Sequence, residues 1–302
     1  MPKRGKNGQG NNRQAELFPG LPRKTPERRL RRITNALWTE NKAKLIQRYL
    51  YYFVLVTHHG TYIDGFAGPQ NPRKLRTWAA RLVLHSKPKW LRHIFLFDIN
   101  RDQVSRLREL MADERSHAPS REIRVYHGDF NSKVRLILKP KRISQREATF
   151  CLLDQRTFEC QWKTVRKLAR YKRGSQHKIE LFYFLAIKWL HRSLAGAKDS
   201  PEVKRWWDRS DWRELSGLSQ DEVRDRVVAR FMDELGYKSV TPWPIYDRRG
   251  AAIVMYYMIH ASDHPEALRL MDRAYHKIVK PRESIEQLSL ALGLPLPAVP
   301  AS

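Results

Sequence analysis

Short apolar segments alternate with helical segments from residue 61 to residue 194. Apolar runs typical of strands occur at 61–64, 93–97, 123–126, 148–153 and 179–186. Segments with the three-and-four apolar spacing of a helix lie between and after them, at 76–85, 101–112, 132–138, 161–171 and 188–194. Strands that alternate with helices build a parallel sheet covered by helices on both faces, so the sequence predicts an α/β fold.

The alternation is flanked by segments of different character. An amphipathic helix is predicted at 38–56, before the first strand. After residue 200 come three tryptophans, two predicted helices (221–235 and 265–279) and a possible strand at 253–260. We expect a disordered basic arm at 1–34, a core at 35–200, a C-terminal elaboration packed on that core at 201–285 and a flexible tail at 286–302.

Four aspartates stand at or just after the carboxyl ends of predicted strands. Asp64 ends the first predicted strand, Asp98 and Asp154 come directly after theirs, and Asp129 follows the third strand closely. Ligands of open α/β sheets bind outside the carboxyl ends of the strands, so these side chains are candidate ligand contacts. Each could instead cap the turn or helix that comes next.

The first of these loops reads Asp64-Gly65-Phe66-Ala67-Gly68. Glycine has no side chain to keep a ligand away, so this turn would let the backbone approach one closely. Asp98 would then be placed to accept hydrogen bonds from ribose hydroxyls. Asp129 offers a carboxylate for an adenine amino group, and Phe130 an aromatic ring for the base.

Several stretches of the chain resemble the class I S-adenosylmethionine-dependent methyltransferases, and more narrowly the three-Cys-motif partner family, a bacterial and phage-associated group. The resemblance covers roughly residues 35–280 and includes Trp162. Its motifs are Trp-Thr-Glu-Asn-Lys at 38–42, Tyr-Ile-Asp-Gly-Phe-Ala-Gly-Pro at 62–69, Phe-Asp at 97–98, Gly-Asp-Phe-Asn at 128–131, Leu-Asp at 153–154 and Ser-Asp-His-Pro at 262–265.

This resemblance implies a Rossmann-like class I methyltransferase fold with a helical N-terminal extension and a C-terminal α+β elaboration. Asp154 would orient the acceptor of the methyl group. It also implies a partner protein with a three-cysteine motif, of the iron–sulfur type. The residues that would hold S-adenosylmethionine are Asp64, Gly65, Phe66, Ala67, Gly68, Asp98, Asp129 and Phe130.

Two positions depart from the family pattern. Gln70 follows Pro69 where the family has glycine, and Asp154 is followed by Gln155 where the family has proline. Proline fixes a backbone angle of the turn that amino-methylating enzymes use, and here that constraint is missing. These departures favour an alternative, a catalytically inactive nucleic-acid-binding or partner-adaptor protein that keeps the fold. A metal-dependent nuclease is a third reading, which would require several acids to converge.

The charge of the chain indicates a polyanionic partner. Lys and Arg number 58 against 31 Asp and Glu, for a net charge of +27. Basic side chains gain free energy by releasing counterions from phosphates, which favours nucleic acid. Trp206, Trp207 and Trp212 could stack on bases, although a buried cluster is the simpler interpretation. We expect the helix after Asp154 to flank the pocket mouth with Lys163, Arg166, Lys167, Arg170, Lys172 and Arg173, unless these form an ordinary solvated face.

Other site types are disfavoured. Only Cys151 and Cys160 occur, and neither stands in the dipeptide expected of a nucleophilic cysteine. The histidines at 58, 59, 260 and 264 fall at or beside predicted turns, so we expect no metal site. We find no secretory signal and no apolar run long enough for a membrane helix, so we expect a cytoplasmic protein.

Overall fold

The computed structural model describes residues 39–69, 71, 73–172, 174, 177–196, 200–246 and 254–279. The predicted basic arm and C-terminal tail lie outside these residues, as do Gln70 and Arg173. The domain boundaries at 34, 200 and 285 therefore stay predictions.

Seven strands of the described residues form one sheet in the order β3-β2-β1-β4-β5-β7-β6. The first five run parallel, and β7 is antiparallel to both of its neighbours, β5 and β6. The strands are β1 Gly60–Asp64, β2 Leu91–Asp98, β3 Glu122–His127, β4 Thr149–Leu153, β5 Glu180–Leu185, β6 Ser239–Tyr246 and β7 Val254–Ser262. This order confirms the predicted fold class, a Rossmann-like α/β fold of the class I methyltransferase kind.

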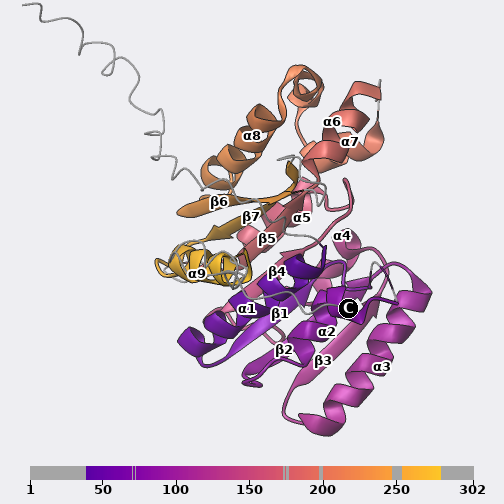
Figure 1. The fold of residues 1–302 in the computed structure, drawn as a ribbon, viewed down its shortest axis with the longest axis vertical. Helices are drawn as coiled ribbons and strands as arrows, with labels where there is room; N and C mark the ends of the chain where they lie inside the picture. The colour runs from indigo at the N-terminus through magenta and orange to yellow at the C-terminus, as the bar shows by residue number, and fades with distance from the viewer. Residues whose placement is uncertain are drawn as a thin grey trace, which may run out of the picture. The chain divides into compact units, whose positions relative to one another are not determined.

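Helices connect the strands and cover the sheet (Figure 1). They are α1 Thr39–Thr57, α2 Ala79–Leu84, α3 Arg101–His117, α4 Phe130–Lys133, α5 Trp162–Ala169, α6 Ile187–Gly196, α7 Pro201–Trp207, α8 Gln220–Asp233 and α9 Ala267–Val279. The described residues also form the 3-10 helices η1 Leu75–Thr77, η2 Val134–Leu136 and η3 Ser210–Gly217. α9 packs beside α1, and α8 packs on β6 (Figure 1).

Alternate residues of each strand point to opposite faces of the sheet, and in β1, β4 and β5 both faces are buried. Ile63, Phe95 and Cys151 share a register row and belong to the core beneath α5 and the α6–α8 segment. Tyr62 and Phe150 share the next row, where Tyr49 of α1 packs against Phe150. Each buried face needs its own helical layer, which accounts for the alternation in the sequence.

The C-terminal elaboration extends the core sheet, because β5 pairs directly with β7. Trp206, Trp207 and Trp212 are buried in the main core, which confirms the cluster interpretation over base stacking. No helix among the described residues has both the length and the apolar character needed to cross a membrane.

Candidate functional site at the carboxyl edge of the sheet

The strand ends that carry the predicted site lie together. Asp64 ends β1 in register with Leu96 of β2 and Leu152 of β4. Asp98 ends β2, and Asp154 directly follows β4. The three acids therefore gather at the carboxyl edge of the parallel strands, as predicted.

Asp64 is a buried residue that shapes the turn after β1. Its Oδ2 accepts a hydrogen bond from the Tyr62 hydroxyl at 2.9 Å, and its Oδ1 accepts one from the Phe66 backbone N–H at 3.1 Å. Burial, chiefly, raises the pKa of this carboxyl to about 7, with the Asp154 and Asp98 charges acting in the same direction. These contacts are those of a turn cap, the alternative role considered for this residue.

Asp98 fastens the glycine loop to the end of β2. Its Oδ2 accepts from the Gly68 N–H at 2.9 Å and its Oδ1 from the Asn100 N–H at 2.8 Å. A Cβ at Gly68 would lie 2.3 Å from Oδ2, so only glycine fits this contact. The Asp98 backbone carbonyl also accepts from Gly128 N–H at 2.9 Å, which joins the end of β3 to the same unit.

Gln103, in the first turn of α3, adds an unpartnered acceptor beside this contact. A Cβ at Gly68 would lie 2.7 Å from the Gln103 Cβ, which shows how close the two residues are. The Gln103 side-chain oxygen is buried and finds no hydrogen-bond partner within the described part of the chain. Buried acceptors are normally satisfied, so this atom marks a place where a ligand donor would fit. Nothing in the sequence pattern pointed to it.

Asp129 and Phe130 make contacts within the protein that differ from the adenine contacts expected from the sequence. Asp129 caps α4, and its Oδ1 accepts from the N–H and the side-chain amide of Asn131 at 3.1 and 2.8 Å. Phe130 is only 2% exposed and packs beneath the loop, where a Cβ at Gly65 would lie 2.9 Å from its ring. Because α4 begins at Phe130, the ring turns into the core and presents no open face for a base.

Asp154 forms a buried ion pair that sequence reasoning missed. The Lys42 ammonium donates to Asp154 Oδ1 at 2.7 Å, with the two side chains 8% and 12% exposed. The same ammonium lies 4.2 Å from the centre of the Phe184 ring at the end of β5. Lys42 belongs to one of the motif stretches above, but its partner is 112 residues away along the chain, so spacing alone could not join them.

The loop after Asp154 is held by Gln155. This buried side chain donates from its amide nitrogen to the Phe184 carbonyl at 3.0 Å. Its amide oxygen accepts from the Cys160 N–H at 2.8 Å. Side-chain hydrogen bonds thus fix the turn at the position where a proline ring was expected.

The six basic residues predicted to flank the site are separated by the fold. Lys163 and Arg166 lie 3.6 and 3.2 Å from the Asp208 carboxylate. α5 ends at Ala169, so Lys172 lies beyond the helix, buried, and donates to the Glu147 carbonyl. Since α5 returns from the end of β4 to the start of β5, its two ends lie at opposite edges of the sheet. Lys167 and Arg170 are exposed, and Arg173 is outside the described residues.

The cysteines and histidines show no activated arrangement. Cys151 and Cys160 are buried, and burial raises the pKa of both thiols, which disfavours the reactive thiolate. His260 lies 2.9 Å from Glu180 Oε1 within the sheet. In the described part of the chain, no group of three or more His, Cys, Asp or Glu side chains is placed to hold a metal ion.

Comparison with known proteins gives only distant similarities. No family profile matches the chain, and no curated protein matches it. The solved structures that resemble this chain include two methyltransferases. The small RNA methyltransferase HEN1 has 13% identity and a TM-score of 0.42 over 71% of this chain and 25% of its own. The CurJ carbon methyltransferase has 12% identity and a TM-score of 0.40 over 72% of this chain and 54% of its own. The fold assignment rests on the strand order, not on these similarities.

Proposed function

We propose that this chain is an S-adenosylmethionine-dependent methyltransferase that acts on nucleic acid. The observation that carries the proposal is the Asp98–Gly68 hydrogen bond of 2.9 Å. It fastens a glycine-containing loop across two neighbouring strand ends, at the edge where Rossmann-like sheets bind nucleotides.

The residues at this edge fit a ligand with a ribose. Each Asp98 oxygen accepts one backbone hydrogen bond and has a second lone pair to offer to ribose hydroxyls. Gln103 supplies a buried acceptor that lacks a donor within the described residues. Asp64 and Phe130 support the loop from inside, while Asp129 holds the start of α4. When bound, S-adenosylmethionine would supply an electrophilic methyl group on its sulfonium.

Asp154 is the candidate residue for the acceptor. Its carboxylate is held by Lys42, and Gln155 holds the backbone that follows. A carboxylate fixed in this way can accept a hydrogen bond from an amino group and so orient the attacking nitrogen. Methyl transfer is largely a matter of such positioning. A base within a duplex would also have to leave the stack.

Nucleic acid is proposed as the substrate because of the charge of the chain. A net charge of +27 favours a polyanion. Membership of the three-Cys-motif partner family, with its iron–sulfur partner and a bacterial cytoplasmic setting, is part of the same proposal. It gains support from the Lys42–Asp154 pair, which joins two of the motif stretches.

A methyl-transfer assay tests the proposal. We expect the full chain to transfer labelled methyl from S-adenosylmethionine to DNA or RNA. Asp154→Asn should abolish transfer, and Asp102→Asn, an exposed aspartate on α3, should leave it unchanged. Equal transfer by the two variants would remove Asp154 from the mechanism.

Two observations favour a second candidate, a non-catalytic nucleic-acid-binding or adaptor protein. Asp154 is largely buried and already paired, and the loop after it lacks the expected proline. Binding of S-adenosylmethionine without transfer to any nucleic acid would support this alternative.

A further inference from the structure

A cavity of about 280 Å³ lies at the edge of the sheet opposite to the acids. Its lining includes Thr149 and Glu180, the first residues of β4 and β5, and Ser262, the last residue of the antiparallel β7. These positions belong to the amino edge of the parallel strands. The methyltransferase proposal assigns no role to this cavity.

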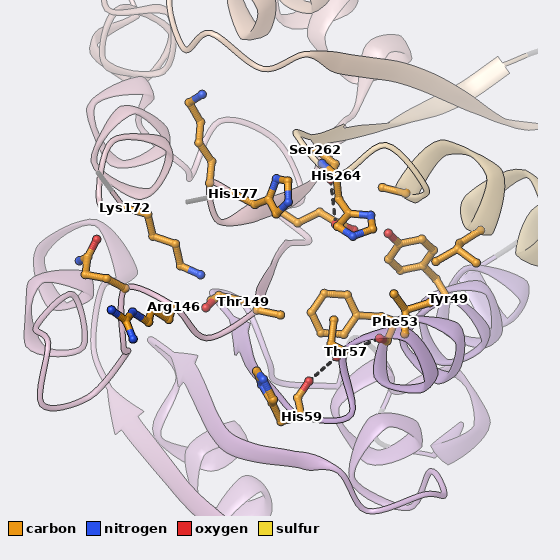
Figure 2. Close-up of a pocket in the computed structure, with 17 residues that line it drawn as sticks. Tyr49, Phe53, Thr57, His59, Arg146, Thr149, Lys172, His177, Ser262 and His264 are labelled. Carbon is orange, nitrogen blue, oxygen red and sulfur yellow. Dashed lines mark hydrogen bonds between the residues drawn. The ribbon is translucent and has the colours of Figure 1, made fainter. Parts of the chain in front are cut away.

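The two sides of the cavity differ in chemistry (Figure 2). Tyr49 and Phe53 of α1 form an aromatic side, and Ala267 and Leu270 of α9, a helix that packs against α1, also line the cavity. Arg146 and Lys172 lie on the other side, across the cavity from Tyr49 and Phe53 (Figure 2). A ligand that fits both sides has an apolar body and an anionic end.

Imidazole rings add to the polar part of the cavity. His177 and His264 lie together with ring centres 5.1 Å apart, and His59 lies at a separate point of the lining (Figure 2). Imidazole can donate a hydrogen bond whether neutral or protonated, so it can donate to a phosphate oxygen over a range of pH.

The carboxylates near the cavity are already satisfied. Glu180 is the one carboxylate among the lining residues, and it accepts from Ser262 Oγ at 3.0 Å and pairs with His260 at 2.9 Å. Glu147, which is not a lining residue, lies 3.1 Å from the His93 ring, and its charge acts to raise the pKa of Lys172. Among the described residues, these two acids pair with His93 and His260, and neither forms an ion pair with Arg146.

Lys172 is a buried cation with a carbonyl partner. Its ammonium donates to the Glu147 backbone oxygen, and the residue is only 8% exposed. Burial lowers its pKa to about 8. The nearby Glu147 charge opposes this effect of burial only in part, and an anion in the cavity would stabilise the ammonium further.

We propose that this cavity binds a nucleotide, with its phosphate between Arg146 and Lys172 and its base against the α1 side. The volume is near the lower end for ligand pockets, which suits a mononucleotide better than a larger cofactor. A free nucleotide and the 5′-terminal nucleotide of a nucleic acid present the same chemistry. The proposal is independent of methyl transfer at the opposite edge.

Calorimetric titration of the full chain with the four 5′-mononucleotides tests this proposal, with adenosine and inorganic phosphate as partial ligands. We expect saturable binding of at least one mononucleotide, weakened about tenfold or more when the phosphate is removed. Arg146→Glu should weaken binding about tenfold or more, and His177→Ala should weaken it less. Arg108→Glu makes the same charge change at an exposed position of α3 and should have little effect.

The source of the nucleotide follows from a second titration with short oligonucleotides that carry a 5′-phosphate or a 5′-hydroxyl. Preference for the free mononucleotide assigns a small-molecule site, and preference for the 5′-phosphorylated oligonucleotide assigns a strand end. Saturable binding of neither ligand class would overturn the proposal, and so would equal binding by Arg146→Glu and Arg108→Glu. Lys172→Met could unfold the chain, but Arg146 and His177 are exposed, so their variants keep the test decisive. S-adenosylhomocysteine should not compete with the mononucleotide for this cavity. Failure of nucleotide binding can therefore be distinguished from failure of the methyltransferase proposal.

Discussion

Lys42 and Asp154 meet from parts of the chain that are 112 residues apart, and both are largely removed from solvent. Removing one partner of a buried pair leaves the other charge uncompensated. We predict that Lys42→Met lowers the free energy of unfolding by about 3 kcal/mol. Denaturant unfolding of the variant measures this loss.

The matched control is Arg205→Met, which removes the exposed ion pair between Arg205 and Glu202. Exposed pairs contribute little, so this variant should unfold like the wild type. The Lys42→Met/Asp154→Asn double variant should lose less than the sum of the two single variants. Additive losses would show that the pair is not coupled.

The contribution of Asp64 to folding stability should depend on pH. Its folded-state pKa of about 7 exceeds the value of about 3.9 in an unfolded chain. Between these values the folded state holds the extra proton, so the contribution of Asp64 to stability falls as pH rises from about 4 to about 7. Asp64→Asn cannot ionise and keeps an acceptor for the Phe66 N–H.

We therefore expect Asp64→Asn to gain stability relative to the wild type as pH rises through this window. Denaturant unfolding at several pH values measures the difference. An exposed-site control, Asp102→Asn, should show no such gain. A constant difference between Asp64→Asn and wild type would contradict the assignment.

At the scale of elements, the loop after β1 depends on Gly68. A Cβ there would lie 2.3 Å from Asp98 Oδ2 and 2.7 Å from Gln103 Cβ, so an alanine must break the loop contact or move α3. We predict that Gly68→Ala costs about 1–3 kcal/mol of unfolding free energy. Gly217 has open space around its Cβ position, so Gly217→Ala should be neutral or slightly stabilising. Equal effects of the two substitutions on thermal unfolding would refute the tight contact.

Most core elements could be predicted from the sequence because their apolar spacing is regular. The predicted strand at 93–97 is β2, and the predicted helix at 101–112 is α3, which continues to His117. The segment 132–138 is not one helix, since α4 and η2 share it. β6 was missed because Pro242 and Pro244 interrupt its pattern, and prolines are tolerated there because β6 is at the edge of the sheet.

The candidate site was predicted only in part. Asp64, Asp98 and Asp154 could be placed from the sequence, because parallel strands bring their carboxyl ends to one edge whatever the loops do. Lys42 and Gln103 could not, because their roles depend on contacts that only the folded chain makes. The inward turn of Phe130 likewise depends on where α4 begins.

At the scale of the molecule, the two edges of the sheet have different chemistry. Acids gather at the carboxyl edge around Asp98, and cations gather at the amino edge around Lys172. A nucleic acid would be repelled by the first group unless basic residues elsewhere hold it. The sequence offers such residues in the arm before residue 34, which carries ten Lys and Arg against two Glu.

We predict that the full chain binds DNA or RNA with an affinity that falls steeply with salt. The slope of log affinity against log salt should be about −0.9 per neutralised phosphate of duplex DNA. Replacing Arg28, Arg29, Arg31 and Arg32 with glutamine should make that slope shallower. Fluorescence anisotropy across a salt series measures it, and an unchanged slope would exclude the arm from the interface.

Binding of S-adenosylmethionine at the carboxyl edge is the premise of the proposed function, and calorimetric titration with S-adenosylhomocysteine is its most direct test. We expect saturable binding with about one ligand per chain. Asp98→Asn should weaken it about tenfold or more, while Asp102→Asn should keep the wild-type affinity. Absence of saturable binding to the folded protein at millimolar ligand would show that this edge is not an S-adenosylmethionine site.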